Sequence, residues 1–214
     1  MVMNFTQSDS DASVTPPSAM LFNANGTMNR VNAQMVVDAA MQGNKSMQFR
    51  LFPDGGAGYA LSLSQRNWRI INVTPTRIEF MAVTAYRTGQ FNDTPSFNYS
   101  TSLVRTNLIN HFYAGVPVAI RNNLVAHGTT DNFAVSGDLI WVPSVNELRG
   151  VPAELRSAPI DTWTRTQSGA VGANMLAAIT SLASMHQGAM DLNTGSTNSI
   201  GIRPVVAINF FYVI

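Results

Sequence analysis

Hydrophobic positions along the chain change their spacing after the first helix-like stretch. Over residues 31–42 apolar side chains recur at helical intervals, and Gly43 follows as a plausible stop. Further on, Met47, Phe49 and Leu51 alternate with polar residues. Helical spacing favours a helix with one buried face, whereas alternation favours strands with one buried face. The pattern therefore predicts a helix over 31–42 and a β-rich region after it.

Runs of alternating or β-branched residues, bounded by Gly, Pro or Asn, predict further strands. They cover residues 59–63, 68–73, 77–84, 138–142, 158–166 and 202–214. Residues 170–190 fit two readings. Their Ala, Leu and Met content favours a helix, while Gly172, Gly188 and the Ser/Thr content oppose one.

Helix starts are marked by short polar side chains. Ser100 or Ser102 can cap a helix over 103–113, and a shorter helical piece is expected within 117–124. Ser144 with Glu147 three positions later fits a capping box, in which each residue satisfies a backbone N–H of the other.

The first twenty residues differ from the rest in composition. They are rich in Ser, Thr and Asp and contain the adjacent pair Pro16 and Pro17, which continues neither a helix nor a strand ladder. The sequence thus predicts an extended arm over 1–20, a turn and helix over 21–45, and a folded α+β domain over 46–214.

Composition and charge exclude several classes of function. Of the 214 residues, 45% are hydrophobic and 12% are charged, against an average of about 25% charged. The net charge of +1 offers no basic field for nucleic acid, and without cysteine no thiol chemistry is possible. Lys45 is the only lysine. The neutral Asn-, Ser- and Thr-rich surface either suits contact with neighbouring chains or reflects the composition of the source genome.

Targeting signals and catalytic patterns are missing from the sequence. We find no basic segment followed by an apolar core, as in an export signal, and no apolar run near the ~20 residues of a membrane span. His111, His127 and His186 lack a zinc-ligand spacing, and no Gly-x-Ser-x-Gly elbow or phosphate loop is present. We expect no enzyme, metal site or cofactor.

Aromatic residues fall into two groups. Trp68, Trp141 and Trp163 lie in strand patterns, which favours core positions over a stacking platform for bases or sugars. Aromatic side chains in Asn-, Ser- and Thr-rich loops suit partner contact. These loop candidates are Tyr86, Phe91, Phe97 and Tyr99.

Several stretches, taken in order over residues 46–210, resemble one domain family of uncharacterised function that occurs in bacterial surface proteins and phage structural proteins. The matching stretches are N-W-R-I-I-N-V at 67–73, R-I-E-F-M at 77–81, Y-S-T-S-L-V-R-T-N-L-I-N at 99–110, D-L-I-W-V-P-S-V-N-E-L at 138–148, T-W-T-R-T at 162–166 and G-I-R-P-V-V-A-I at 201–208. The family is similar in outline to C-type-lectin-like and formylglycine-generating-enzyme folds. The resemblance implies a mixed sheet with few short helices and long loops, and strands within 170–190. Asn107 and Thr162 depart from the family's tryptophans, and the cysteine chemistry of the enzymes is excluded.

Arg203 lies inside an apolar strand pattern, where an unpaired charge is very costly. It must find a carboxylate or backbone carbonyls. We expect Glu147 as its partner, with Arg165 competing for the same carboxylate, and an architectural role for all three.

These features predict a phage virion structural protein, located in the virion as a capsid decoration, tail or fibre component. Its partners would be other virion proteins and further copies of itself, with a host glycan or receptor as an additional candidate and neither nucleic acid nor membrane. The alternative is a carbohydrate- or receptor-binding module on a bacterial cell surface.

Overall fold

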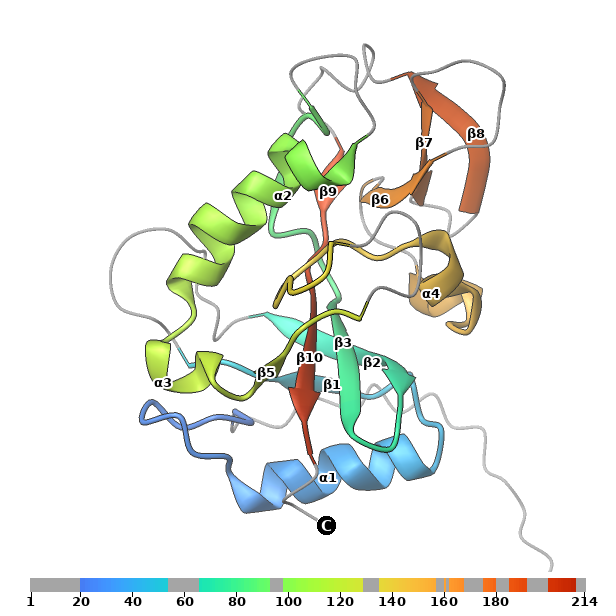
Figure 1. Ribbon diagram of the computed structural model, residues 1–214. Coiled ribbons are helices and arrows are strands. Elements are labelled where there is room, and N and C mark those ends of the chain that lie inside the picture. Colours follow the sequence, from blue (N-terminus) through green and yellow to red (C-terminus); the bar gives the residue numbers. More distant parts are fainter. Residues whose placement is uncertain are drawn as a thin grey trace, which may run out of the picture.

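Two five-stranded sheets form the frame of the protein in the computed structural model (Figure 1). The structure describes residues 20–53, 66–92, 98–128, 135–156, 160, 162–167, 175–179, 185–191 and 200–210. The predicted arm before Met20 and the predicted strand at 59–63 lie outside these residues. The described part is an α+β fold with antiparallel and mixed sheets.

The first sheet has the order β1-β2-β3-β10-β5, and all its neighbours are antiparallel. Its strands are β1 (Gln48–Arg50), β2 (Asn67–Val73), β3 (Arg77–Ala82), β5 (Leu124–Val125) and β10 (Val205–Asn209). The β2–β3 hairpin follows the predicted strands, with the tight connection at 74–76 closed by a hydrogen bond of 2.9 Å from the Thr74 N–H to the Arg77 carbonyl. The final run splits into two strands because Pro204 interrupts it.

The second sheet has the order β4-β9-β6-β7-β8, in which only the β6–β9 pair is parallel. Its strands are β4 (Arg87–Thr88), β6 (Thr162–Gln167), β7 (Met175–Ile179), β8 (Met185–Asp191) and β9 (Gly201–Ile202). Strands β7 and β8 show that the described residues within 170–190 form strands and not a helix. Cross-strand pairing here overrides a helix-favouring composition.

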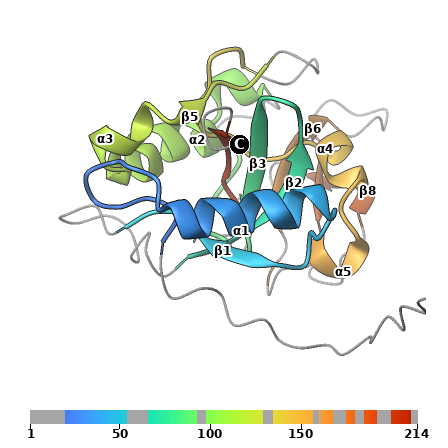
Figure 2. The ribbon, with the colours of Figure 1, turned by 90° about the horizontal axis from the view of Figure 1, so that it is seen from below.

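The helices lie around the sheets, and α1 lies across the β2–β3 end of the first sheet (Figures 1 and 2). They are α1 (Arg30–Met41), η2 (Tyr99–Thr101), α2 (Leu103–Asn107), the π-helical η3 (Leu108–Tyr113), α3 (Val118–Arg121), α4 (Val145–Arg149) and α5 (Ala153–Arg156). The predicted helices at 31–42, 103–113 and 117–124 are confirmed. Ser102, not Ser100, caps α2 and accepts from the Arg105 N–H at 3.1 Å.

Asn29 is the N-cap of α1, and its side chain accepts hydrogen bonds from the N–H groups of Val31 and Asn32. Val36 and Val37 are buried against the sheet, whereas Val31 is 71% exposed. The apolar spacing that included Val31 therefore located the helix but misjudged which residues face the core.

The predicted strand at 138–142 is wrong. Only Trp141 pairs there, in an isolated bridge with Val205. The Asp138 N–H is used in a turn to the Val135 carbonyl, and Pro143 has no N–H with which to extend a ladder.

Buried aromatic rings occupy the core. Trp68 meets Phe52 and Phe112 edge-on, with ring centroids 5.5 and 6.0 Å apart. Trp141 and Trp163 are also buried, which confirms the core assignment of all three tryptophans.

Candidate functional site

A buried ionic cluster of Glu147, Arg165 and His127 joins α4 to β6. Arg165 donates to both carboxylate oxygens of Glu147, with Nη1 2.7 Å from Oε2 and Nη2 2.9 Å from Oε1. The His127 ring nitrogen Nε2 lies 2.9 Å from the same Oε1. Nε2 also lies 3.2 Å from Arg165 Nη2. An ionised carboxylate only accepts hydrogen bonds, so Nε2 acts as a donor to Oε1, and its proximity to Arg165 Nη2 follows from two donors sharing that oxygen.

Local sequence sets the position of the carboxylate. The predicted capping box is confirmed: the Glu147 N–H donates to Ser144 Oγ, and the Ser144 N–H donates to Glu147 Oε2 at 2.7 Å. One carboxylate therefore caps α4 and binds Arg165. Since the Arg165 N–H donates to the Pro143 carbonyl, β6 runs beside the start of that helix.

Opposing effects determine the charge of Glu147. Burial alone would raise the pKa of its carboxyl. The hydrogen bonds from His127 and Arg165, the positive charge of Arg165 and the Ser144 N–H outweigh burial and lower that pKa to about 2. Glu147 is consequently ionised across the whole physiological range.

The cluster is suited to holding the fold together, not to chemistry on a substrate. Arg165 and His127 are buried, and both oxygens of Glu147 are already bound. No group of three His, Asp or Glu residues within the described ranges could hold a metal ion. His111 lies in η3 and His127 in the cluster, while the side chain of His186 lies outside the described part.

The expected pairing of Arg203 with Glu147 is wrong. Arg203 instead donates to the carbonyls of Ala82 at 2.9 Å and Arg156 at 2.6 Å. The competing partner, Arg165, takes the carboxylate because its strand lies next to α4. Burial, and secondarily the charge of Arg69, lowers the pKa of the Arg203 guanidinium.

A second arginine, Arg69, also donates to a backbone carbonyl. Arg69 donates to the Leu155 carbonyl at 2.5 Å, so that Arg69 and Arg203 bind two carbonyls at the C-terminal end of α5. Cations are favourable where helix carbonyls have no partner inside the helix. Arg203 therefore remains structural, as expected, but through carbonyls.

The aromatic loop candidates for partner contact do not form a surface. Tyr86 is 8%, Phe91 1% and Tyr99 2% exposed, and Phe97 lies outside the described residues. The loops are polar, but the side chains of Tyr86, Phe91 and Tyr99 point inward. Tyr86 packs edge-on against Phe112, and Phe91 against Trp163.

Tyr99 is buried, and its hydroxyl group connects its own segment to the backbone at Val142. Its hydroxyl oxygen accepts from the Val142 N–H at 3.3 Å, and burial, followed by the nearby negative charge of Asp138, raises the pKa of the phenol. The expectation that Tyr86, Phe91 and Tyr99 contact a partner is therefore wrong.

An apolar groove lies between α1 and the β2–β3 hairpin in the part of the chain that the structure describes. It has a volume of about 70 Å³ and combines residues of α1, of the hairpin and of the segment directly after β10. Its lining residues are Val37, Ala40, Met41, Val73, Thr74, Pro75, Thr76, Arg77, Ile78 and Phe210. Met41 is 81% and Val73 45% exposed.

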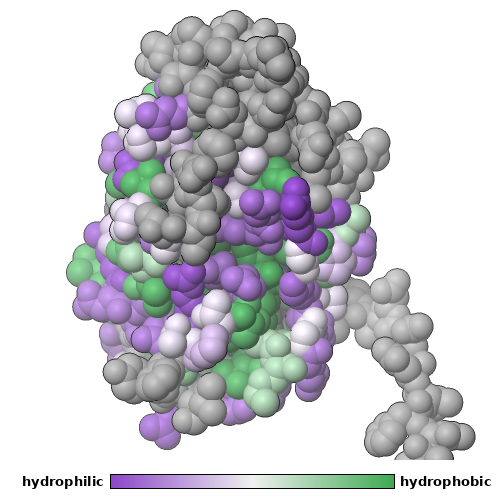
Figure 3. Space-filling view, turned by 45° about the vertical axis from the view of Figure 1, so that its right-hand side comes forward, coloured by the Kyte–Doolittle hydropathy of each residue, from purple (hydrophilic) through white to green (hydrophobic). Residues whose placement is uncertain are grey.

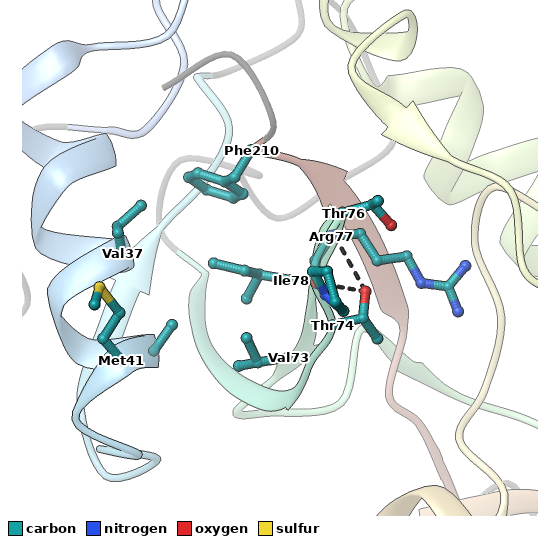
Figure 4. A pocket seen from close by; sticks show the side chains of 10 residues that line it. Val37, Met41, Val73, Thr74, Thr76, Arg77, Ile78 and Phe210 are labelled. Atoms are coloured by element: carbon teal, nitrogen blue, oxygen red, sulfur yellow. Dashed lines mark hydrogen bonds between the residues drawn. The ribbon is translucent and has the colours of Figure 1, made fainter. Parts of the chain in front are cut away.

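The side chains of the groove face one another across a gap (Figure 4). Val37 and Met41 project from α1 toward Val73, Ile78 and Phe210, which come from the sheet. On the face shown in Figure 3, hydrophobic surface gathers among hydrophilic residues in the lower half, where Figure 1 places α1 and the hairpin.

Among the described residues that line this groove, only Arg77 is charged, and it is already engaged. The Arg77 side chain points away from α1 (Figure 4), with Nη2 2.7 Å from Glu79 Oε1 and Nη1 3.2 Å from the Ala126 carbonyl. The groove thus presents hydrocarbon and few polar groups.

Sequence reasoning missed the groove, and for Arg203 it named backbone carbonyls as possible partners but favoured Glu147. The available signal for the groove was an apolar residue at an end of each element, Met41 in the last turn of the helix and Val73 before the turn. No local pattern brings these two together, because they meet only when α1 packs across the hairpin.

Comparison with known proteins gives no relative. No protein-family model matches the chain, no curated protein is detectably similar in sequence, and no solved structure is detectably similar to the fold. Within the described part, no helix has both the length and the apolar character needed to span a membrane.

Proposed function

We propose that this protein is a structural component of a phage virion, built as a C-type-lectin-like domain with an N-terminal arm, and that it acts by contact with other proteins in repeated copies. Its sequence motifs resemble those of a domain family that occurs in phage structural proteins and in bacterial surface proteins, and we propose the first of these two settings. The neutral, lysine-poor composition fits a protein whose surface is covered by neighbours.

The observation that carries the proposal is the contrast between bound polar groups and an open apolar groove. The arginine, glutamate and histidine side chains of the ionic cluster, and Arg203, are occupied with each other or with backbone carbonyls. The groove at Met41 and Val73 leaves hydrocarbon in water. Such a surface gains free energy by docking a partner, not by activating a substrate.

Repeated copies make a small contact sufficient. A groove of this size supports only weak binding alone, but many copies fixed on one particle act together and raise the overall affinity.

The test has two readouts. Sedimentation velocity of the purified chain should show a concentration-dependent symmetric oligomer, and mass spectrometry of purified phage particles should detect the chain at a fixed copy number. A strictly monomeric chain that is absent from particles contradicts the proposal. Glycan binding by such a monomer would favour the bacterial surface module instead.

A further inference from the structure

The groove is built to take an uncharged apolar segment. Met41, Val73 and Phe210 line it, and Arg77 is held by Glu79 and a backbone carbonyl. A charged ligand would lose its hydration here without gaining a partner, whereas methionine, valine or phenylalanine side chains would bury apolar surface.

The described surface offers too few exposed hydrophobic residues for a broad, flat interface between two folded domains. Large hydrophobic residues are exposed at four described positions, Val31, Met41, Val73 and Val118. A stable interface of standard size buries about 800 Å² per partner around an apolar centre. Two of the four residues lie together at the groove, so copies would associate best by placing a narrow segment into it.

The chain contains a segment of the required chemistry. Residues 1–5 read M-V-M-N-F, which is four apolar side chains without a charge. The connecting residues lead to Met20, whose carbonyl is held by the Asn32 side chain of α1 at 3.0 Å. At roughly 3.3 Å per residue, the 15 residues from Phe5 to Met20 span up to about 50 Å, enough to reach a neighbouring domain.

We propose that the groove binds residues 1–5 of a neighbouring copy, so that exchanged arms join adjacent subunits. This inference rests on the proposed function and names the partner at its groove. The sequence-based expectation of an extended arm, which rests on the adjacent Pro16 and Pro17, favours a reach to a neighbouring copy over a tight return to the same domain.

Paired cysteines test the contact directly, because the chain has none of its own. The variant N4C/T76C places one thiol within the arm segment and one on the exposed rim of the groove, and leaves the apolar residues in place. Mixed isotopically heavy and light chains are oxidised, and mass spectrometry of the linked peptides separates links between copies from links within one copy. The control N4C/V118C carries its second thiol at an exposed position on α3, outside the groove.

We expect disulfide links that join position 4 of one copy to position 76 of another, formed between heavy and light chains at least about tenfold more often than the corresponding links of the control. Links within one copy only, or equal yields in the two variants, would overturn the inference. A second measurement uses no cysteine: M41Q/V73T should weaken self-association about tenfold, as expected from losing roughly one buried apolar side chain, while V118T leaves it unchanged.

The two proposals fail in different ways. If the chain occurs in particles and forms oligomers that M41Q/V73T does not weaken, the arm contact is wrong and the virion role stands. If the chain is monomeric and absent from particles, both are wrong.

Discussion

The ionic cluster at α4 and the groove at α1 invert the usual distribution of polar and apolar groups. In the cluster, Glu147, Arg165 and His127 are charged or polar and largely buried. In the groove, Met41 and Val73 are apolar and exposed. Each arrangement is unfavourable unless a partner is supplied, since buried charges need counter-charges and exposed hydrocarbon gains by being covered.

The two regions differ in the origin of the groups that satisfy them: counter-charges for the cluster, and apolar cover for the groove. The cluster finds its hydrogen-bond partners within the same domain, and its contribution to the free energy of folding can be tested there. The groove finds no comparable cover among the described residues, so its exposed side chains remain for a partner to cover. Substitutions in the two regions should therefore affect different measurements.

The largest effect is expected from Arg165→Met. Removal of the guanidinium leaves the Glu147 carboxylate buried without its main counter-charge, which costs about 3–5 kcal/mol of unfolding free energy. Urea unfolding followed by tryptophan fluorescence measures the loss. The double variant E147Q/R165M is the control, and it should recover a large part of the stability because no unpaired charge remains. A loss below about 1 kcal/mol in the single variant would show that the pair does not hold α4 to β6.

Acid should weaken the same region next most strongly. Because the folded pKa of Glu147 is lowered to about 2 from 4.5, its contribution is fully present above pH 4.5 and is lost as the pH falls toward 2. The loss is on the order of 3 kcal/mol. NMR titration of the Glu147 side-chain carboxyl carbon should give a midpoint near 2. A midpoint near 4.5 would mean that Arg165 and His127 do not stabilise the carboxylate.

Local sequence rules predicted much of this region and little of its long-range pairing. The capping box depends on residues three positions apart, and the hairpin depends on a turn between two alternating runs, so both were readable from the sequence. Which arginine meets Glu147 depends on β6 lying beside the start of α4, a contact between segments 18 residues apart. The choice between Arg165 and Arg203 was for this reason open.

The groove was unpredictable for a related reason. Tyr86 and Tyr99 suggested a binding surface because their neighbours are polar, but a loop's composition does not fix the direction of each side chain. Met41 and Val73 were read as parts of their own elements, and only packing of α1 on the hairpin makes them one surface. Tertiary contact decides which apolar residues stay exposed.

A moderate effect is expected from Ser144→Ala. The substitution removes the hydroxyl that accepts from the Glu147 N–H but leaves the Glu147–Arg165 pair in place, so unfolding free energy should fall by about 1 kcal/mol. The matched variant S144T keeps a hydroxyl acceptor and should lose less. Equal losses in both variants, measured by urea unfolding, would indicate that the cap itself contributes nothing.

The smallest loss of unfolding free energy is expected from substitutions in the groove, in contrast to the large loss expected in the cluster. Met41→Gln and Val73→Thr replace exposed side chains, 81% and 45% accessible respectively, so each should change the unfolding free energy by no more than about 0.5 kcal/mol. The internal control is Val37→Thr: Val37 lines the same groove from a buried position on α1, and a hydroxyl there should destabilise the domain. Losses at Met41 and Val73 as large as at Val37 would mean that these side chains are already covered within the domain, and the groove would then be part of the core and not a binding surface.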